Sequence, residues 1–342
     1  MPLSKIKTNS IADEVFEAGS NLIINGGMTI SQRGSTFADL ANGAYGIDRY
    51  VIYHSDDGAV TVSQDTTVPA GEGFKNSMKF DVTTADTSLG SSQYYQFAQK
   101  IEGQNMARLE WGTANAKSVT LSFWIRSNLT GTYNIYLLNS AANRYHPVNF
   151  TIDSANTWEK KTITVAGDTT GTWLTTNGVG MFVVWNLALS SNYLTGTNAT
   201  WSTNDAGVSG TTQANFLSST SNELYITGVQ LEVGEQATPF QHRSITQDKI
   251  DCFRYYYRYT TTDNPGTRNR WLFNIDDNDN YRRCTHTFPV VMRGTPAITT
   301  SFYGSPGSNR GNQHINCHGT DCWADSVGSY AYYTDLVADA EL

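Results

Sequence analysis

Hydrophobic and polar residues alternate along several short segments of this chain. Between Ser118 and Ser127 every second residue is apolar, and a period of two recurs in Thr157–Gly167 and Asn222–Gly234. Side chains of a β-strand point alternately to opposite faces of a sheet, so this period predicts strands that bury one face. The segment Val179–Leu189 is apolar almost throughout, which is typical of a strand buried on both faces.

Gly, Asn, Ser and Asp separate these segments and mark turns. Seven or more predicted strands with such turns indicate an all-β fold, a jelly-roll β-sandwich, over residues 21–242. The stretch NLIINGGM (Asn21–Met28) is predicted to be its opening strand, which ends in a turn at Asn25-Gly26-Gly27. Gly228 is expected to form a β-bulge inside the strand predicted at Asn222–Gly234.

Residues 243–342 are predicted to form a smaller C-terminal β domain. Its first part, residues 244–259, suits either a short helix or a helix that runs into a strand, and further strand-like segments follow. Residues 1–20 are polar, with few apolar side chains, and could not order themselves alone. We expect them to be a short anchoring segment that orders on another protein.

Composition and charge narrow the class of protein. Hydrophobic residues make up 39% of the chain and charged residues 16%, while aromatic residues reach 12%, which favours β-sheets and argues against disorder. The net charge is −8 and Lys and Arg form no cluster, so a nucleic-acid partner is not expected. No segment approaches the ~18 apolar residues of a membrane span, and no signal peptide is recognisable, so neither membrane insertion nor signal-directed export is expected.

Four stretches, at the start, the middle and the end of the sandwich region, resemble sequences of bacteriophage tail-fibre and related virion appendage proteins. They are NLIINGGM, the central WIRSNLTGTY and TWEKKTITVAGDTTGTW, and the run from ELYITGVQLEVG to CFRYY. Within such proteins, residues 21–242 resemble carbohydrate-binding jelly-roll modules. FPVVMRGTPAIT (Phe288–Thr299) and the ending ADAEL are similar to sequences that follow in phage fibres.

The resemblance implies a protein of the virion, assembled in the host cytoplasm. Residues 1–20 would bind other virion proteins, and the chain would form a homo-oligomer, a trimer as in phage fibres. The implied function is non-catalytic adhesion to a host surface glycan or receptor during adsorption. The alternatives are a capsid or tail decoration protein that stabilises the particle and, third, a polysaccharide depolymerase.

Sugar binding needs aromatic rings that stack on a pyranose and polar groups that bind its hydroxyls. Rings on a polar strand face or in polar loops are therefore the candidates. The predicted sugar-binding residues are Trp124, Arg126, Tyr94, Tyr95, Trp111, Tyr145 and Trp201. For each ring, burial inside the sandwich is the competing interpretation. Phe123, Trp158 and Phe182 are expected in the core.

No catalytic residues are predicted. Glycoside hydrolysis requires two carboxylates that flank a cleft, and the acidic residues here are scattered and match no catalytic motif. We therefore expect no enzyme activity.

Two patterns could hold a metal. Asp276, Asp277 and Asp279 lie in one loop, and oxygen-rich loops suit calcium, but the loop lacks the glycine and the distant glutamate of an EF-hand, which favours a solvated turn. The cysteines all lie near the C-terminal end: Cys252, Cys284, Cys317 and Cys322. Free thiols, a disulfide and a metal site remain open for them. Calcium is thus the one cofactor that the sequence suggests.

The stretch FRYYYRY, residues 253–259, would be an exposed aromatic stripe on a monomer. Burial between subunits of a symmetric oligomer explains it, and burial between the two domains is the alternative. The predicted interface residues are Tyr255, Tyr256, Tyr257 and Tyr259.

Overall fold

The computed structural model describes residues 21–203, 208–209, 213–260, 274–275, 281–304, 310–325 and 331–342. It divides into two compact units, Met1–Ser244 and Ile245–Leu342. Both units consist mainly of antiparallel β-strands, which confirms the predicted all-β class.

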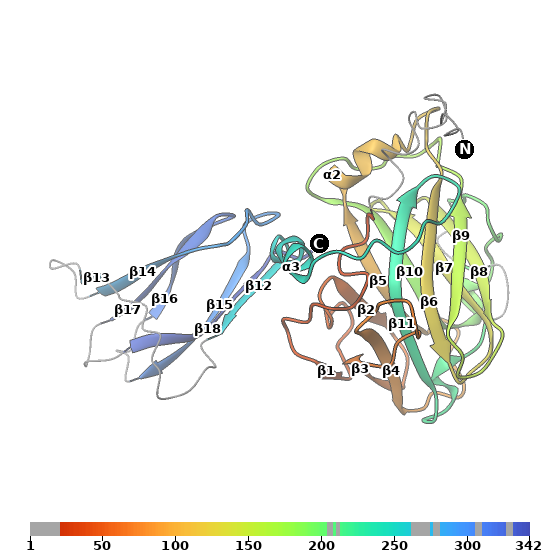
Figure 1. The fold of residues 1–342 in the computed structure, drawn as a ribbon, viewed down its shortest axis with the longest axis horizontal. Coiled ribbons are helices and arrows are strands. Elements are labelled where there is room, and N and C mark those ends of the chain that lie inside the picture. Colours follow the sequence, from red (N-terminus) through yellow and green to blue (C-terminus); the bar gives the residue numbers. More distant parts are fainter. Residues whose placement is uncertain are drawn as a thin grey trace, which may run out of the picture. The chain divides into compact units, whose positions relative to one another are not determined.

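The N-terminal unit is a sandwich of two antiparallel sheets, drawn with its strands running roughly along one direction in Figure 1. The six-stranded sheet has the order β1 (Thr36–Ala38), β3 (Ala59–Asp65), β4 (Ser77–Thr84), β11 (Glu223–Val233), β6 (Val119–Ser127), β9 (Glu159–Val165). The five-stranded sheet has the order β2 (Tyr50–His54), β5 (Tyr94–Glu102), β10 (Val179–Leu189), β7 (Gly131–Asn139), β8 (Tyr145–Ile152). Short helical turns lie between strands: α2 (Gly103–Met106), η2 (Ala107–Leu109), η3 (Ser191–Tyr193) and η4 (Phe216–Ser218).

One apolar core fills the space between the two sheets. Aromatic rings dominate its centre, where Trp185 stacks on Phe97 at 4.9 Å and meets Phe123 edge to face at 5.9 Å. The alternating positions Leu121, Phe123 and Ile125 of β6 all point into this core, as their period of two predicts. Burial of each such side chain contributes about 1.5–3 kcal/mol.

The predicted opening strand is wrong, because residues 21–26 join no β-ladder. They lie instead between the two sheets. The amide of Leu22 donates to the carbonyl of Leu231 in the six-stranded sheet, and the side chain of Gln99 in the five-stranded sheet accepts from the amide of Ile24 and donates to its carbonyl. The Gly26 carbonyl accepts from the amide of Val229. This N-terminal staple, residues 21–26, thus links both sheets.

Both ends of the sandwich chain lie at one corner. The Asn21 side chain accepts from the amide of Leu231 at 2.9 Å and donates to the carbonyl of Val229 at 3.0 Å. The backbone amide of Asn21 reaches the Gln241 side chain at 3.4 Å, and the amide of Gln241 donates to Gln230. The chain therefore enters and leaves the sandwich beside β11.

The β-bulge predicted at Gly228 is confirmed. The pairing of β11 with β6 shifts register between Thr227 and Gln230, and Gly228 has φ +63°. Glycine adopts this left-handed conformation without the steric cost of a side chain. Val229 and Leu231, just after the bulge, are the β11 residues that hydrogen-bond to the N-terminal staple.

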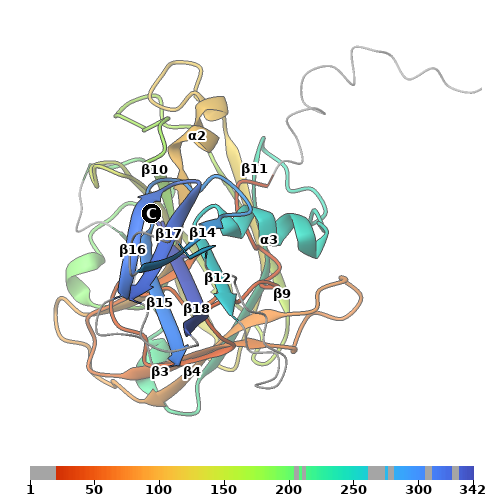
Figure 2. The same cartoon turned by 90° about the vertical axis from the view of Figure 1, so that its left-hand side faces the viewer.

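The C-terminal unit begins with α3 (Ile245–Phe253), which runs directly into β12 (Tyr256–Thr260). One sheet has the order β12, β18 (Ala331–Asp339), β15 (Ala297–Gly304), and these strands lie side by side in Figure 2. The other sheet has the order β13 (Asn274–Ile275), β14 (Tyr281–Thr287), β17 (Gly319–Asp325), β16 (Arg310–Asn316). A small core of Phe288, Met292, Leu336, Ala338 and Ala340 holds the unit together.

Candidate glycan-binding face

The outer face of the five-stranded sheet carries a group of aromatic rings. Across its strands, Val51, Ala98, Val184 and Tyr136 form one register row and make an apolar base that points away from the main core. Five partly buried rings pack against this base: Tyr45, Tyr53, Tyr94, Phe182 and Tyr193. We call these five rings the aromatic platform. Their partial exposure leaves ring surface available to a ligand.

A lysine lies among the platform rings. The Lys100 Nζ atom is 5.6 Å from the ring centroid of Tyr45 and 5.7 Å from the centroids of Tyr53 and Phe182. Such cation–π contacts hold the lysine stem and the rings in a fixed arrangement. Burial, followed by the proximity of Tyr94, raises the pKa of Tyr53 to about 12, so its phenol remains a neutral hydrogen-bonding group.

A row of carboxamides crosses the same face next to the platform. Gln96, Asn186, Asn134 and Asn149 are register neighbours on four adjacent strands. Asn186 Nδ2 donates to Asn134 Oδ1 at 2.7 Å, and Asn134 Nδ2 donates to Asn149 Oδ1 at 3.1 Å. The Asn186 Oδ1 atom is buried and accepts from no donor among the described residues. Asn134 and Asn186 are fully buried and Gln96 is only 7% exposed, so this row links the strands beneath the platform and is not itself open to a ligand.

Residues 193–202 border the platform along β8. The amide of Ala199 donates to the carbonyl of Pro147, and Ser202 forms a two-way backbone bridge with Tyr145. The Asn198 side chain accepts from the amide of Asn149 at 2.8 Å. This segment is therefore attached to β8 by backbone hydrogen bonds at two positions.

Three tryptophans meet at one end of the sandwich, where loops from distant parts of the chain converge. Trp111 lies 4.7 Å from Trp173 and 5.3 Å from Trp201, and Trp173 lies 5.5 Å from Trp201, all edge to face. The indole nitrogens of Trp111 and Trp201 donate to backbone carbonyls, those of Lys117 and Ala166. These rings therefore close the core.

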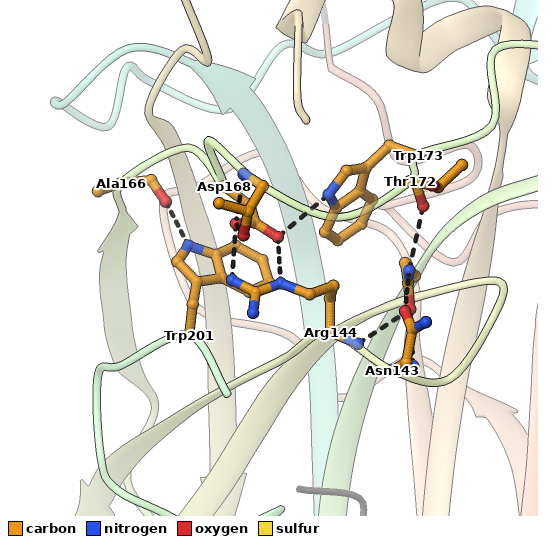
Figure 3. Close-up of polar contacts among 9 residues, drawn as sticks. Asn143, Arg144, Ala166, Asp168, Thr172, Trp173 and Trp201 are labelled. Atoms are coloured by element: carbon orange, nitrogen blue, oxygen red, sulfur yellow. Dashed lines mark hydrogen bonds and ion pairs between the residues drawn. The ribbon is translucent and has the colours of Figure 1, made fainter. Parts of the chain in front are cut away.

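An ion pair fixes the same loops. Arg144 donates from Nε and Nη2 to the two carboxylate oxygens of Asp168, each at 2.7 Å, and its guanidinium lies over Trp201 (Figure 3). Asp168 also accepts from Thr170 and from Trp173 Nε1. Burial disfavours the charged form, but the hydrogen bonds from Arg144 and Thr170 outweigh it, so the pKa of Asp168 is held below its ordinary value. Because both carboxylate oxygens of Asp168 already accept hydrogen bonds, its role is to stabilise these loops.

His146, next to this ion pair, makes the stability of the sandwich pH-dependent. Its ring is buried 4.8 Å from Trp201, and burial lowers the pKa of His146 to about 4. In the unfolded chain the histidine has its ordinary pKa of about 6.5. Between pH 6.5 and pH 4 the unfolded chain therefore binds a proton that the folded chain does not. The free energy of unfolding falls as the pH is lowered through this range. We expect this histidine to account for a loss of roughly 2–3 kcal/mol.

The measurement is urea unfolding of the wild type and of His146→Gln at pH 7 and pH 4.5. The wild type should lose more stability between the two pH values than the variant, which has no imidazole to protonate. Equal losses in both proteins would contradict the assignment.

The predicted sugar-binding residues do not form one site but lie in different parts of the sandwich. Tyr94 belongs to the platform, whereas its neighbour Tyr95 points into the core and is only 3% exposed, which corrects its prediction as a ligand residue. Trp111 and Trp201 come together in the tryptophan cluster, and Tyr145 is buried on the outer face of β8. Trp124 and Arg126 are partly exposed on the outer face of the six-stranded sheet.

Sequence reasoning missed several platform residues. Phe182 was expected in the core, but it faces outward opposite Lys100. The expectation for Trp158 is also wrong, because this ring is partly exposed, while Phe123 is buried as predicted. A polar residue inside the apolar run of β10, Asn186, was the available signal for a second, outward-facing polar row.

The other predicted residues belong to the C-terminal unit. Asp276, Asp277 and Asp279 lie outside the described residues, and within the described part of the chain no group of three or more His, Cys, Asp or Glu could hold a metal. Tyr255 and Tyr256 are buried, and Tyr257 and Tyr259 are partly exposed. Tyr257 packs against rings of its own unit: Phe253, His286 and Phe288. No helix in the described ranges has the length and apolarity that a membrane span requires.

No protein-family model matches the chain, and no curated protein sequence matches it. Among solved structures, the enzymatically active domain of tailspike protein 4 of bacteriophage CBA120 is 13% identical over 57% of this chain and 21% of its own, with a TM-score of 0.33. The family 11 carbohydrate-binding module of Clostridium thermocellum is 11% identical over 59% of this chain and 98% of its own, with a TM-score of 0.30. The module TmCBM61 is 9% identical over 64% of this chain and 100% of its own, with a TM-score of 0.30. The chain thus spans about a fifth of the tailspike domain.

Proposed function

We propose that the sandwich is a non-catalytic glycan-binding module, and that the aromatic platform is its binding surface. The observation that carries this proposal is the group of five partly exposed rings on one sheet face, with the Lys100 ammonium over three of them. Rings stack on the apolar faces of pyranoses, and the tyrosine hydroxyls can both donate to and accept from the hydroxyls of a sugar.

We further propose that the chain belongs to a phage virion appendage, a tail fibre or a similar structure, and binds a host surface glycan during adsorption. The support is the order of sequence motifs that resemble phage fibres, beginning with Asn21–Met28. Residues 1–20 would then bind other virion proteins. Several weakly binding copies on one particle would raise the effective concentration and give firm attachment. The assembly of these copies as a trimer is part of the same proposal.

The test is binding of the full chain to a panel of bacterial lipopolysaccharides and capsular polysaccharides. We expect one or more to bind, and we expect Tyr53→Ala and Phe182→Ala each to weaken that binding at least about 10-fold, since loss of an aromatic contact commonly costs about 1.4 kcal/mol or more. The matched control is Phe37→Ala, which removes a partly exposed ring from β1 of the other sheet and should leave the affinity unchanged.

Three outcomes would overturn the proposal. Binding that survives both platform substitutions would exclude the platform. Shortening of a bound polysaccharide would show an enzyme. If the chain binds nothing in the panel and its deletion makes the virions unstable, the structural decoration role is favoured instead. Antibody labelling of purified virions checks the location of the chain.

A further inference from the structure

A second group of aromatic and basic residues lies on the outer face of the six-stranded sheet. Lys79, Tyr225 and Arg126 are register neighbours on the adjacent strands β4, β11 and β6. The Tyr225 ring has Lys79 Nζ at 5.7 Å and Arg126 Cζ at 5.1 Å from its centroid. One tyrosine is therefore held between two cations, and its position fixes both.

The two cations differ in how their charge is compensated. Lys79 Nζ donates to Glu223 Oε1 at 2.6 Å, and the Tyr225 hydroxyl donates to Glu223 Oε2 at 3.0 Å. The hydrogen bond from Lys79 is the main reason that the pKa of Glu223 lies below its ordinary value. Glu223 is thus ionised and hydrogen-bonded to Lys79, and charge attraction to Arg126 is a smaller cause of its lowered pKa.

Arg126 is held in place by neutral groups. Its Nε atom donates to the carbonyl of Asn156 at 2.9 Å, and Nη2 reaches Asn156 Oδ1 at 3.5 Å. Among the described residues no carboxylate lies within ion-pair distance of Arg126, and Nη1 has no acceptor. The guanidinium is therefore a positioned cation with donors directed to solvent.

Two tryptophans lie on the same sheet face as this guanidinium. Trp124 precedes Arg126 by two residues on β6 and so lies on the same face, and Trp158 lies 6.3 Å from Tyr225. Both indoles are partly exposed. Flat apolar rings on the same face as a guanidinium that forms no ion pair among the described residues suit a pyranose that carries a carboxylate, because the ring of the sugar can stack while the carboxylate binds the guanidinium.

We propose that Trp124, Arg126 and Trp158 form a second saccharide-binding site, selective for sugars with a carboxylate and distinct from the aromatic platform on the other sheet. Arg126 binds the carboxylate and the tryptophans contact the sugar ring. The Lys79–Glu223–Tyr225 group positions the guanidinium. The two sites lie on the outer faces of different sheets, so one module can hold two saccharide chains, or two parts of one chain.

The experiment measures binding of tetragalacturonate and of its methyl ester to the full chain by calorimetry. Esterification removes the charge but keeps the sugar ring, so we expect the ester to bind at least about 10-fold more weakly, in line with the strength of a charge-assisted hydrogen bond. Arg126→Gln should weaken tetragalacturonate binding by a similar factor, and Arg126→Lys should weaken it less. Phe37→Ala is the control that should not change it, and circular dichroism of each variant checks the fold.

Each other result decides against the second site. Equal affinity for acid and ester would exclude carboxylate recognition. Equal binding of dextran sulfate and tetragalacturonate, unaffected by Arg126→Gln, would mean unspecific ion attraction. Loss of tetragalacturonate binding in Tyr53→Ala but not in Arg126→Gln would assign the ligand to the platform, and that result would leave the proposed function standing. No detectable binding by the wild type would overturn the proposal outright.

Discussion

Gly26→Ala should unfold the sandwich or lower its stability by more than about 4 kcal/mol, the range of exceptional single substitutions. A Cβ atom at Gly26 would lie 2.0 Å from the carbonyl oxygen of Val229. The obstacle is backbone, so no side-chain rotation relieves it. Val229 cannot retreat easily, because its amide donates to the Gly26 carbonyl at 3.0 Å and β11 lies between two neighbouring strands.

The next glycine in the chain provides a matched control. A Cβ atom at Gly27 would have its nearest neighbours at 3.9 Å, an ordinary van der Waals distance. Gly27→Ala should therefore change stability by less than about 1 kcal/mol. Both variants are compared by soluble yield and by thermal melting followed by tryptophan fluorescence. A melting temperature of Gly26→Ala within two or so degrees of the wild type would show that the N-terminal staple is not needed by the sandwich.

Asp168→Ala is expected to be the second most damaging substitution. It removes the partner of Arg144, whose side chain is only 15% exposed, and it also removes the acceptor of the Trp173 indole. Breaking a buried ion pair on one side costs about 3–5 kcal/mol because the other charge remains buried without compensation. For a unit of this size the melting temperature should fall by roughly 10 °C.

A double-mutant cycle separates the ion pair from general disruption of the loops. In Arg144→Met/Asp168→Ala the buried charge is absent, so part of the stability should return relative to Asp168→Ala alone. Urea unfolding followed by tryptophan fluorescence reports on this region, since Trp111, Trp173 and Trp201 surround the pair. Strictly additive losses from the two single substitutions would mean that Arg144 and Asp168 do not stabilise each other.

The fold class could be predicted from sequence because the period of two is a local property. β6, β10 and β11 lie where alternation or continuous apolar character places them. The opening stretch could not be predicted in this way. Residues 21–26 look like a strand, but their hydrogen bonds go to β11 and to one glutamine of β5, partners that lie some 75 to 210 positions away. Local pattern carries no information about such distant partners.

The candidate site was harder to predict for a related reason. Tyr94 and Tyr95 must face opposite sides of a sheet, but sequence alone did not decide which side is solvent. Phe182 looked like a core residue because both faces of β10 are covered, one by the sandwich core and one by neighbouring rings. Trp111 and Trp201 are joined through loops, and no spacing rule predicts that contact.

The first and last residues of the sandwich lie at one corner, and this affects how the domain can be exchanged during evolution. The Asn21 amide and the Gln241 side chain are in direct contact, so the two ends of the segment 21–241 lie side by side. A domain with adjacent ends can be inserted into another chain, or exchanged for a different one, without forcing the flanking segments apart. A recombination event that cuts at these two positions would replace both proposed saccharide-binding faces at once and leave residues 1–20 and the C-terminal unit unaltered.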